Sequence, residues 1–425
     1  MTLTPLDKGR VLRADGAMLI ARNRSFGLLF SASAITNLGD GVSALAFPWL
    51  ATLITRDPFL IGAVAFATRL PWLLFAVPAG VLTDRADRRR LMVQADLLRL
   101  LLTCGVIALI LTVPRFPVAE AGRYILALSA LAFLLGCAEV IRDNAAQTVL
   151  PSIVAPADLE AANGQLWSVE QVAGSFLGPP LAGVLIAVAV PVPFALDAVT
   201  FGLAAWLVWM IALPPRLAPP RKPLRKELAE GWAWMRGAPT ILRLALMLAV
   251  INGFYAMFTT VLVLVSQERF GLDAVGHGVL LTAGAAGGVI GGLAGPRLIA
   301  RIGPQRAVTA AMLLFPLPPL LVWLTGSPWI AGAALFAETF SGMLWNIVTV
   351  SYRQRRIPDA LLGRVNSIYR FFGWGAIPLG ALAGGALVAL AEPMLGRATA
   401  LGLPYLVGTI GLSALAAYGL ARLRL

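Results

Sequence analysis

Among the ionisable residues inside long apolar stretches of this sequence, where a charge is costly and is normally kept for a function, four are of most interest. They are Asp40, Arg69, Glu139 and Glu338, and we expect their side chains to line an internal cavity. Asp40 and Arg69 lie near the middle of two consecutive stretches, so two adjacent helices would carry opposite charges at one depth. We expect these two side chains to form an ion pair, which a proton on Asp40 would break.

Two of the carboxyl groups are candidates to carry a proton beside Asp40. Glu338 lies midway along its apolar stretch, with no basic residue close to it in sequence. A carboxyl group without a nearby cation in low-dielectric surroundings suits reversible protonation. Glu139 lies one helical turn from Arg142 and is the next candidate. Asp40 is favoured as the residue that couples proton movement to the rest of the protein.

Other polar residues are expected to have structural roles. Asp96 and Arg99 are three residues apart and would form a shallow pair near one membrane surface. His277, the single histidine, begins an apolar stretch and is expected to lie in a loop. The sequence contains no GxxxxGK[ST] phosphate loop and no cluster of metal-ligand type. These absences argue against an enzyme, a nucleotide-driven pump, a bound metal ion and an organic cofactor.

The elements that would position these residues are twelve apolar stretches of about 20 residues, long enough for helices that cross a ~30 Å hydrocarbon core. Hydrophobic residues make up 59% of the chain and charged residues 13%, so lipid must cover part of the surface. The sequence therefore predicts an all-α membrane protein with twelve transmembrane helices. The stretches are 26–54, 59–82, 92–113, 124–141, 165–189, 192–213, 240–266, 274–299, 307–324, 328–351, 366–390 and 399–421.

Basic residues occupy alternate gaps between these stretches. Of the 34 Lys and Arg residues, 25 fall in the terminal segments and the even-numbered gaps, and five fall in the odd-numbered gaps. By the positive-inside rule, both termini are cytoplasmic and the protein lies in the cell membrane. The net charge of +13 is thus explained by topology and anionic lipid, and nucleic acid is not expected as a partner. We expect a monomer.

The chain divides near its middle. Residues 1–213 would form an N-terminal six-helix bundle and residues 239–425 a C-terminal one. Residues 214–238 are rich in Pro and basic residues, with apolar residues at helical spacing, which predicts a cytoplasmic linker containing an amphipathic helix. The two halves also contain weak repeats. Asp57 and Asp273 precede corresponding stretches, and the similar tracts PADLEAAN and PDALLGRVN precede stretches five and eleven.

A short basic loop follows the second stretch. Gly80 allows close helix packing, Asp84 can face a helix N-terminus, and the cluster that includes Arg85 and Arg88 can pair with carboxylates such as Asp143. This spacing resembles the signature loop between helices two and three of the major facilitator superfamily, although Asp87 stands where that superfamily usually has glycine. The resemblance implies a gating loop that latches the two bundles together in the outward-facing state.

The fifth stretch contains the sequence GSFLGPPLAG. Gly174, Gly178 and Gly183 give a smooth helix face for close packing, and Pro179 with its neighbour Pro180 favours a kink. The segment resembles the antiporter motif of the major facilitator superfamily, with Ala182 in place of one glycine. The resemblance favours exchange of substrate against an ion over symport.

Several tracts in the first half are similar to the branch of the superfamily that includes enterobactin exporters and macrolide efflux proteins. They are TNLGDGVSALAFPWL, RLPWLLFAVPAGVLTDRADRRR, NAAQTVLPSIV and ADLEAANG. The similarity implies export of a bulky amphipathic small molecule by alternating access, driven by the proton gradient. A lysophospholipid flippase or a nutrient symporter of the same fold is the alternative.

Overall fold

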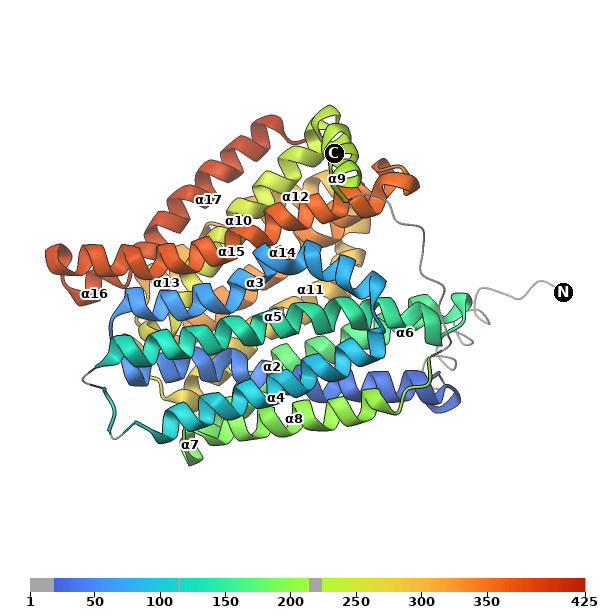
Figure 1. The fold of residues 1–425 in the computed structure, drawn as a ribbon. Coiled ribbons are helices and arrows are strands. Elements are labelled where there is room, and N and C mark those ends of the chain that lie inside the picture. The colour runs from blue at the N-terminus through green and yellow to red at the C-terminus, as the bar shows by residue number, and fades with distance from the viewer. Residues whose placement is uncertain (1–18, 114, 119, 214–223, 425) are drawn as a thin grey trace.

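The computed structural model describes residues 19–113, 115–118, 120–213 and 224–424, and each regular element in that part of the chain is a helix. The long helices lie roughly side by side, as Figure 1 shows. Those of the first half lie mostly in the lower part of that view, and those of the second half in the upper part.

We call the helices from α2 to α8 the first helix group. Its members are α2 (Arg24–Ile54), α3 (Pro58–Arg85), α4 (Arg88–Leu111), α5 (Ala121–Ile153), the 3-10 turn η1 (Pro156–Asp158), α6 (Leu159–Glu170), the π-helical segment η2 (Gln171–Leu177), α7 (Gly178–Val188) and α8 (Val192–Trp209). The helix α9 (Leu224–Gly237) follows, within the segment where the sequence predicts a linker helix.

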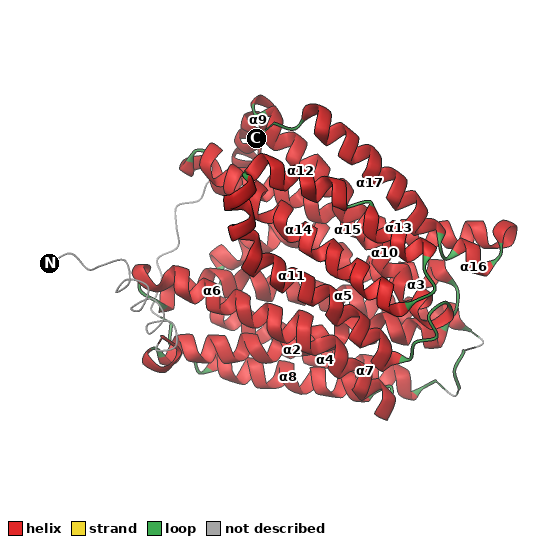
Figure 2. Ribbon diagram, turned by 180° about the vertical axis from the view of Figure 1, so that it is seen from behind, coloured by secondary structure: helices red, strands yellow, loops and turns green. Residues whose placement is uncertain are grey.

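We call the helices from α10 to α17 the second helix group. Its members are α10 (Pro239–Glu268), α11 (Ala274–Ile302), α12 (Pro304–Leu314), α13 (Leu317–Leu324), α14 (Pro328–Arg356), α15 (Asp359–Leu395), α16 (Arg397–Ala400) and α17 (Leu403–Arg422). Figure 2 gives the reverse view, in which α4 and α8 lie on one side of the molecule and α12 and α17 on the other.

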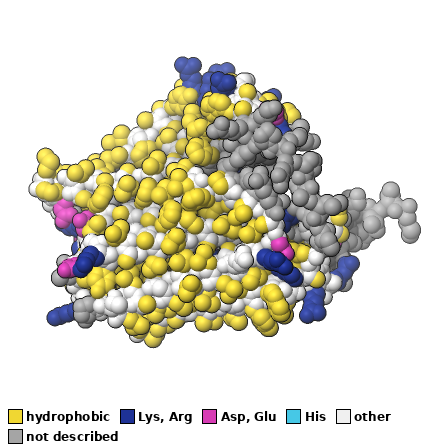
Figure 3. Space-filling model, in the orientation of Figure 1, with side chains coloured by type: hydrophobic (Ala, Val, Ile, Leu, Met, Phe, Trp, Pro, Cys, Tyr) yellow, Lys and Arg dark blue, Asp and Glu magenta, His cyan; other side chains and the backbone are white. Residues whose placement is uncertain are grey.

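Eleven stretches of the described helices are long and apolar enough to cross a membrane. They match the predicted stretches except the first, which corresponds to α2 and is not among the eleven. The α2 helix has 31 residues, but Asn37, Asp40 and several glycines lower its hydropathy. In Figure 3, hydrophobic side chains spread over the middle of the visible face, and charged side chains gather toward its two ends. The chain is therefore a multi-pass membrane protein.

Side-chain caps explain where several helices begin. Asp57 caps α3 by accepting from the backbone N–H of Phe59 at 2.8 Å, and Asp273 caps α11 by accepting from that of Gly276 at 2.8 Å. The two aspartates singled out as a repeat thus start corresponding helices. Asp87, the departure from the superfamily pattern, caps α4 by accepting from the Arg90 N–H at 3.1 Å.

Within the first group, α2 and α4 pack against α8, while α3 and α4 pack against α5. Within the second, α10 packs against α15 and α17, and α14 packs against α11 and α12. The most extensive contacts between the groups are those of α3 with α15 and of α7 with α11. Of these helices, α3, α11 and α15 begin at the repeated sequence tracts.

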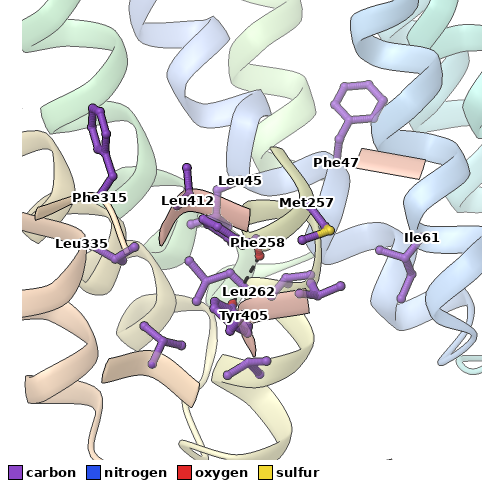
Figure 4. Packing of buried hydrophobic residues seen from close by; sticks show 14 of the residues in the cluster. Leu45, Phe47, Ile61, Met257, Phe258, Leu262, Phe315, Leu335, Tyr405 and Leu412 are labelled. Atoms are coloured by element: carbon purple, nitrogen blue, oxygen red, sulfur yellow. Dashed lines mark hydrogen bonds between the residues drawn. The ribbon is translucent and has the colours of Figure 1, made fainter. Parts of the chain in front are cut away.

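Apolar packing inside the second group holds α17 against α10. The rings of Phe258 and Tyr405 stack with centroids 5.7 Å apart, and the Tyr405 hydroxyl donates to the Phe258 carbonyl at 3.2 Å (Figure 4). Met257 and Leu262 lie in the same cluster, to which Leu45 of the first group also belongs. The core thus extends from one group into the other and fixes the helices that surround the cavity.

Candidate functional site

Two adjoining chambers lie between the helix groups. The first has a volume of 760 Å³ and the second a volume of 390 Å³. They share six lining residues, which come from α3, α5, α10 and α15: Arg69, Glu139, Tyr255, Ala256, Thr259 and Ile377. Together the two chambers are large enough for a drug-sized molecule.

The larger chamber extends toward the end of the molecule where α6 and α15 begin, which we call the open end. Its lining there includes the exposed side chains of Gln147, Trp167 and Glu170. The smaller, deep chamber ends below the opposite end, where α3 and α11 begin, which we call the sealed end. The described lining is thus exposed to the surface at the open end.

A chain of charged side chains runs along the wall of this cavity in the first group. Asp40 of α2 forms an ion pair with Arg99 of α4. Arg99 lies 3.9 Å from Asp96, which lies 3.6 Å from Arg142 of α5. Arg142 in turn lies 3.6 Å from Asp143. The side chains of Arg99, Asp96 and Arg142 are only 4%, 0% and 5% exposed, so these charges depend on one another rather than on water.

The expected ion pair between Asp40 and Arg69 is wrong, because Asp40 pairs with Arg99. The α3 helix packs mainly against α5 and α15, and its Arg69 side chain lines both chambers without an ion pair to any described residue. Arg99 is also deeper than expected. The α4 helix begins at Arg88, so Arg99 lies about 16 Å along it, near the middle of the bilayer.

Asp197 of α8 is a buried carboxylate on this wall that the sequence analysis did not single out. It is 2% exposed and lines the deep chamber. The Ser43 hydroxyl donates to it at 2.5 Å, and Thr200 lies 3.5 Å from its other oxygen. Its position inside the apolar stretch 192–213 is the same signal that identified Asp40, and it could have been found that way.

Glu139 and Glu338 differ in their relation to the cavity. Glu139 of α5 lines both chambers, and its carboxylate lies within electrostatic range of Arg99 and Arg69. Glu338 of α14 lines neither chamber, in contrast to the expectation that placed it in the substrate cavity. It lies within electrostatic range of Tyr255, which does line both.

Part of the predicted gating loop lies outside what the structure describes, namely the surroundings of Gly80 and the side chains of Asp84 and Arg85. Of the described members, Arg88 is buried and donates to the Thr148 carbonyl of α5 at 2.5 Å. This contact ties the start of α4 to α5 at the open end. Asp143, the predicted partner of the loop, lines the larger chamber next to Arg142.

The antiporter-like segment forms an unusual helix. Residues Gln171–Leu177 are π-helical and lead into α7, whose first turn contains Pro179 and Pro180. A π turn widens the helix, which accommodates the missing backbone donors of the two prolines. A Cβ atom added at Gly178 would lie 2.5 Å from the Gly41 backbone, so only glycine lets η2 and α7 approach α2 this closely.

The sealed end is closed by close contacts between backbones of the two groups. A Cβ atom added at Gly183 of α7 would lie 2.4 Å from the Ala274 carbonyl oxygen of α11. On the other side, a Cβ atom added at Gly385 of α15 would lie 2.2 Å from the Pro58 carbonyl oxygen of α3. Each helix pair between the groups thus has a glycine at a point where a side chain does not fit.

Polar contacts reinforce this closure at the surface. Arg397 forms ion pairs with Glu268 and Glu392, each at 2.8 Å, and donates to the Arg56 carbonyl of the first group at 2.9 Å. The Arg56 side chain donates to Gln267 of the second group. The two bonds of Arg56 link the groups at the sealed end, and the two ion pairs hold Arg397 in place there.

His277 is not a loop residue, and that expectation is wrong. It lies in the first turn of α11, is 4% exposed, and lines the deep chamber. Its Nδ1 atom lies 2.7 Å from the Ser266 hydroxyl, and its ring lies 6.0 Å from that of Trp49. The first turn of α11 is covered because α7 packs against this helix.

The long apolar helices, the cavity between two groups and the closure at one end define a class of protein, a membrane transporter of the major facilitator type. The chain belongs to the major facilitator family described as transmembrane secretion effector, which matches residues 17–416. It is therefore a secondary transporter of the efflux type that carries a small molecule, and it is not an enzyme.

Similar proteins include several named transporters. The multidrug efflux pump Tap of Mycobacterium tuberculosis is 26% identical over 390 residues, which are 86% of this chain and 87% of that protein. The enterobactin exporter EntS of Shigella boydii is 25% identical over 389 residues, 88% of each. A bacterial homologue of the iron transporter ferroportin in an inward-facing state has the same fold, with a TM-score of 0.71 and 16% identity over 93% of this chain and 99% of that chain.

Proposed function

We propose that this transporter exports a bulky amphipathic small molecule, such as a drug, a macrolide or a siderophore, in exchange for protons. The named relatives support export of this kind. The cavity supports a bulky substrate, because its chambers measure 760 and 390 Å³ and combine ionisable residues with aromatic ones such as Trp72 and Trp374. No cofactor is needed, since the proton gradient would supply the energy.

The observation that carries the proposal is the cluster of carboxylates around one buried arginine. The Arg99 guanidinium lies within electrostatic range of Asp40, Asp96, Glu139 and Asp197. Arg142 lies near Asp96 and Arg69 lies within electrostatic range of Glu139, but with Asp143 the carboxylates still outnumber the cations, and like charges at short range repel each other. The carboxylates therefore cannot all be ionised at little cost. Such a cluster can take up and release protons as a unit. Because three of its members line the cavity, a substrate that enters would change the charge balance of the cluster.

We infer that Asp40 couples proton movement to transport through Arg99, in place of the expected Arg69. A proton on Asp40 would weaken its pairing with Arg99, which would then turn toward Asp96, Glu139 or Asp197. The α2 helix carries Asp40, and it also packs against η2 and α7, which join the two groups through α11. A change at Asp40 thus occurs on a helix that packs directly against α7, one of the helices that form the contacts at the sealed end.

The proposed topology has twelve spans, with α2 as the first. Its 31 residues extend over about 46 Å, and its polar residues face the cavity or α8 rather than lipid. Residues 1–213 and 239–425 would form two six-helix bundles joined by the linker 214–238. On this topology both termini and the open end would be cytoplasmic, which the distribution of basic residues supports. The protein is then an inward-facing monomer in the cytoplasmic membrane.

In this scheme, transport alternates between two states. Separation of α3 from α15 and of α7 from α11 would open the deep chamber to the outside. The open end would close at the same time, with the basic loop from Gly80 to Arg88 and Asp143 forming the latch. Close contacts at glycines favour two discrete arrangements over a continuous range, because a packed interface is either closed or open.

The test uses everted membrane vesicles that contain the full-length protein, with ethidium and erythromycin as the first probes. We expect accumulation of at least one probe that requires an inside-acid gradient and stops when the gradient is collapsed. Glu139→Gln should abolish the gradient-dependent part, whereas Glu120→Gln should not, because Glu120 is an exposed residue paired with Arg123. Accumulation that is independent of the gradient would contradict proton exchange, and accumulation only with an inside-alkaline gradient would favour the symporter.

A further inference from the structure

A third chamber, of 320 Å³, lies inside the second helix group and shares Arg370 and Trp374 with the larger chamber of the cavity. We call it the arginine chamber. Its lining comes from α10, α14 and α15 and from Phe315, which follows α12, and it contains two arginines but no aspartate or glutamate. The lining residues are Leu248, Ile251, Asn252, Phe315, Gly342, Trp345, Asn346, Thr349, Arg353, Tyr369, Arg370 and Trp374.

Arg353 of α14 is held rigidly at the wall of this chamber. Its guanidinium lies 3.6 Å from the centroid of the Tyr369 ring, and it donates to the Asn366 side-chain oxygen at 2.8 Å and the Thr349 carbonyl at 3.4 Å. None of these partners carries a negative charge. An arginine stays charged at any physiological pH, so this site has a fixed cation whose remaining N–H donors have no carboxylate among the described residues.

Arg370 of α15 adds a second cation at the entrance. Its guanidinium lies 5.1 Å from the centroid of the Trp374 ring, and it makes no ion pair with a described residue. Because the two arginines line one chamber without a carboxylate, the potential inside is positive. A charge in partly dehydrated surroundings costs free energy unless a counter-ion is near. The missing counter-ion would be supplied by a ligand.

Trp345 provides an independent observation. Its ring is 2% exposed and packs against Phe315, with the ring centroids 6.2 Å apart. Its Nε1–H group is buried and has no hydrogen-bond partner within the described structure, although the residue lines the chamber. A buried donor without an acceptor is unfavourable. It therefore points to a ligand that brings an acceptor oxygen to this chamber.

We propose that the arginine chamber binds the anionic oxygen group, carboxylate or phosphate, of an amphipathic molecule. Arg353 would hold two of its oxygens with parallel N–H bonds, Trp345 would donate to the same group, and Arg370 would lie at the entrance from the cavity. The apolar part would lie against Leu248, Ile251 and Phe315. This assignment rests on the proposed function only for the statement that the chamber belongs to the path of the transported substrate. Binding of the anion itself does not depend on the proposed function.

The test measures binding of radiolabelled laurate by equilibrium dialysis to the purified full-length protein in phosphatidylcholine nanodiscs, with empty nanodiscs as background. Laurate should bind at least tenfold more tightly than dodecanol, which has the same chain and no charge. Arg353→Gln should weaken laurate binding by about tenfold to a hundredfold, because a charge-assisted hydrogen bond is lost. The exposed Arg355 of the same helix does not line the chamber, so Arg355→Gln should change nothing.

Trp345→Phe keeps an aromatic ring and removes the N–H donor, but it also removes part of the indole from the core, so the melting temperature of the free protein should fall whatever the role of the donor. We expect laurate binding to weaken about twofold to tenfold while dodecanol binding is unchanged. A purely structural role would lower the melting temperature without changing the ratio of the laurate and dodecanol affinities. Because no proton gradient is present, this result is independent of whether transport is proton-coupled.

A second set of nanodiscs identifies the source of the anion. If phosphatidylglycerol displaces laurate, the occupant is an anionic lipid head group, and if it does not, the occupant is a free amphipathic anion. Either result supports an anion site in the arginine chamber. The proposal is overturned if dodecanol binds as tightly as laurate, or if Arg353→Gln binds laurate like the wild type.

Discussion

Replacing Gly385 with alanine should shift the protein away from the state with a closed outer end. In the sealed arrangement, the new Cβ atom would lie 2.2 Å from the Pro58 carbonyl oxygen and 3.1 Å from the Gly62 Cα atom. Ordinary contacts begin at 3.4 Å, so α3 and α15 would have to separate by about 1.2 Å at this point. In the open arrangement these helices are apart, and the methyl group meets nothing.

The expected size of the effect follows from the cost of overpacking. Forcing an extra methyl group into a well-packed contact costs about 1–3 kcal/mol. Because this cost falls only on the sealed state, the ratio of outward-open to sealed molecules should rise by a factor of about 5 to 150. The backbone oxygen of Pro58 cannot rotate away as a side chain would, which puts the effect toward the upper part of this range.

The assay is a distance measurement between spin labels at Phe59 and Leu390, which are 44% and 76% exposed on α3 and α15 at the sealed end. Cys104 and Cys137 are first replaced by serine. Gly385→Ala should add a longer distance to the distribution. Gly292→Ala on α11 is the matched control, since its Cβ atom would have no atom within 4 Å and its helix propensity changes equally. Identical distributions for Gly385→Ala and the wild type would refute the reasoning.

Three further substitutions test other parts of the account. Asp40→Asn leaves the buried Arg99 with a weaker partner and should lower the free energy of unfolding by about 1–3 kcal/mol. This is less than the loss for a fully buried pair, because the Asp40 side chain is 35% exposed. An unchanged melting temperature would contradict this expectation. Arg397→Gln removes the bond to the Arg56 carbonyl that links the groups, together with two ion pairs inside the second group. It should lengthen the spin-label distance less than Gly385→Ala does, because partly exposed pairs contribute about 1 kcal/mol or less; a larger effect would assign the closure to Arg397. Asp84→Asn should slow transport with no loss of folded protein, and transport at the wild-type rate would mean that the loop only sets topology.

Much of the fold follows from composition and periodicity. Eleven of the twelve stretches correspond to helices able to span a membrane, because in lipid an apolar run of this length has few alternatives to a helix. The α9 helix lies where apolar residues recur at helical spacing in the linker. The cap residues Asp57 and Asp273 likewise start helices, since an aspartate before an apolar run satisfies the free N–H groups at a helix start.

The site could be predicted only in part. The sequence indicates how deep in the membrane a residue lies better than it indicates which side chains surround that residue. Asp40 and Glu139 line the cavity, while their part in proton coupling stays a prediction. The partner of Asp40 is Arg99 rather than Arg69, since α4 and not α3 brings a cation to its side of α2. Such choices depend on helix packing, which follows from small-residue contacts such as that of Gly41 with Gly178. These contacts lie far apart in the sequence and have no periodic signal.

The measurement that tests the central claim most directly is proton release on substrate binding. The purified protein is placed in weakly buffered solution with a pH indicator, and the compound that everted vesicles accumulate is added. Our account predicts release of protons by the wild type, and less release by at least one of Asp40→Asn, Glu139→Gln and Asp197→Asn, while Glu120→Gln behaves like the wild type. If substrate binds without proton release, or if all three variants release protons as the wild type does, the cluster around Arg99 does not couple protons to transport.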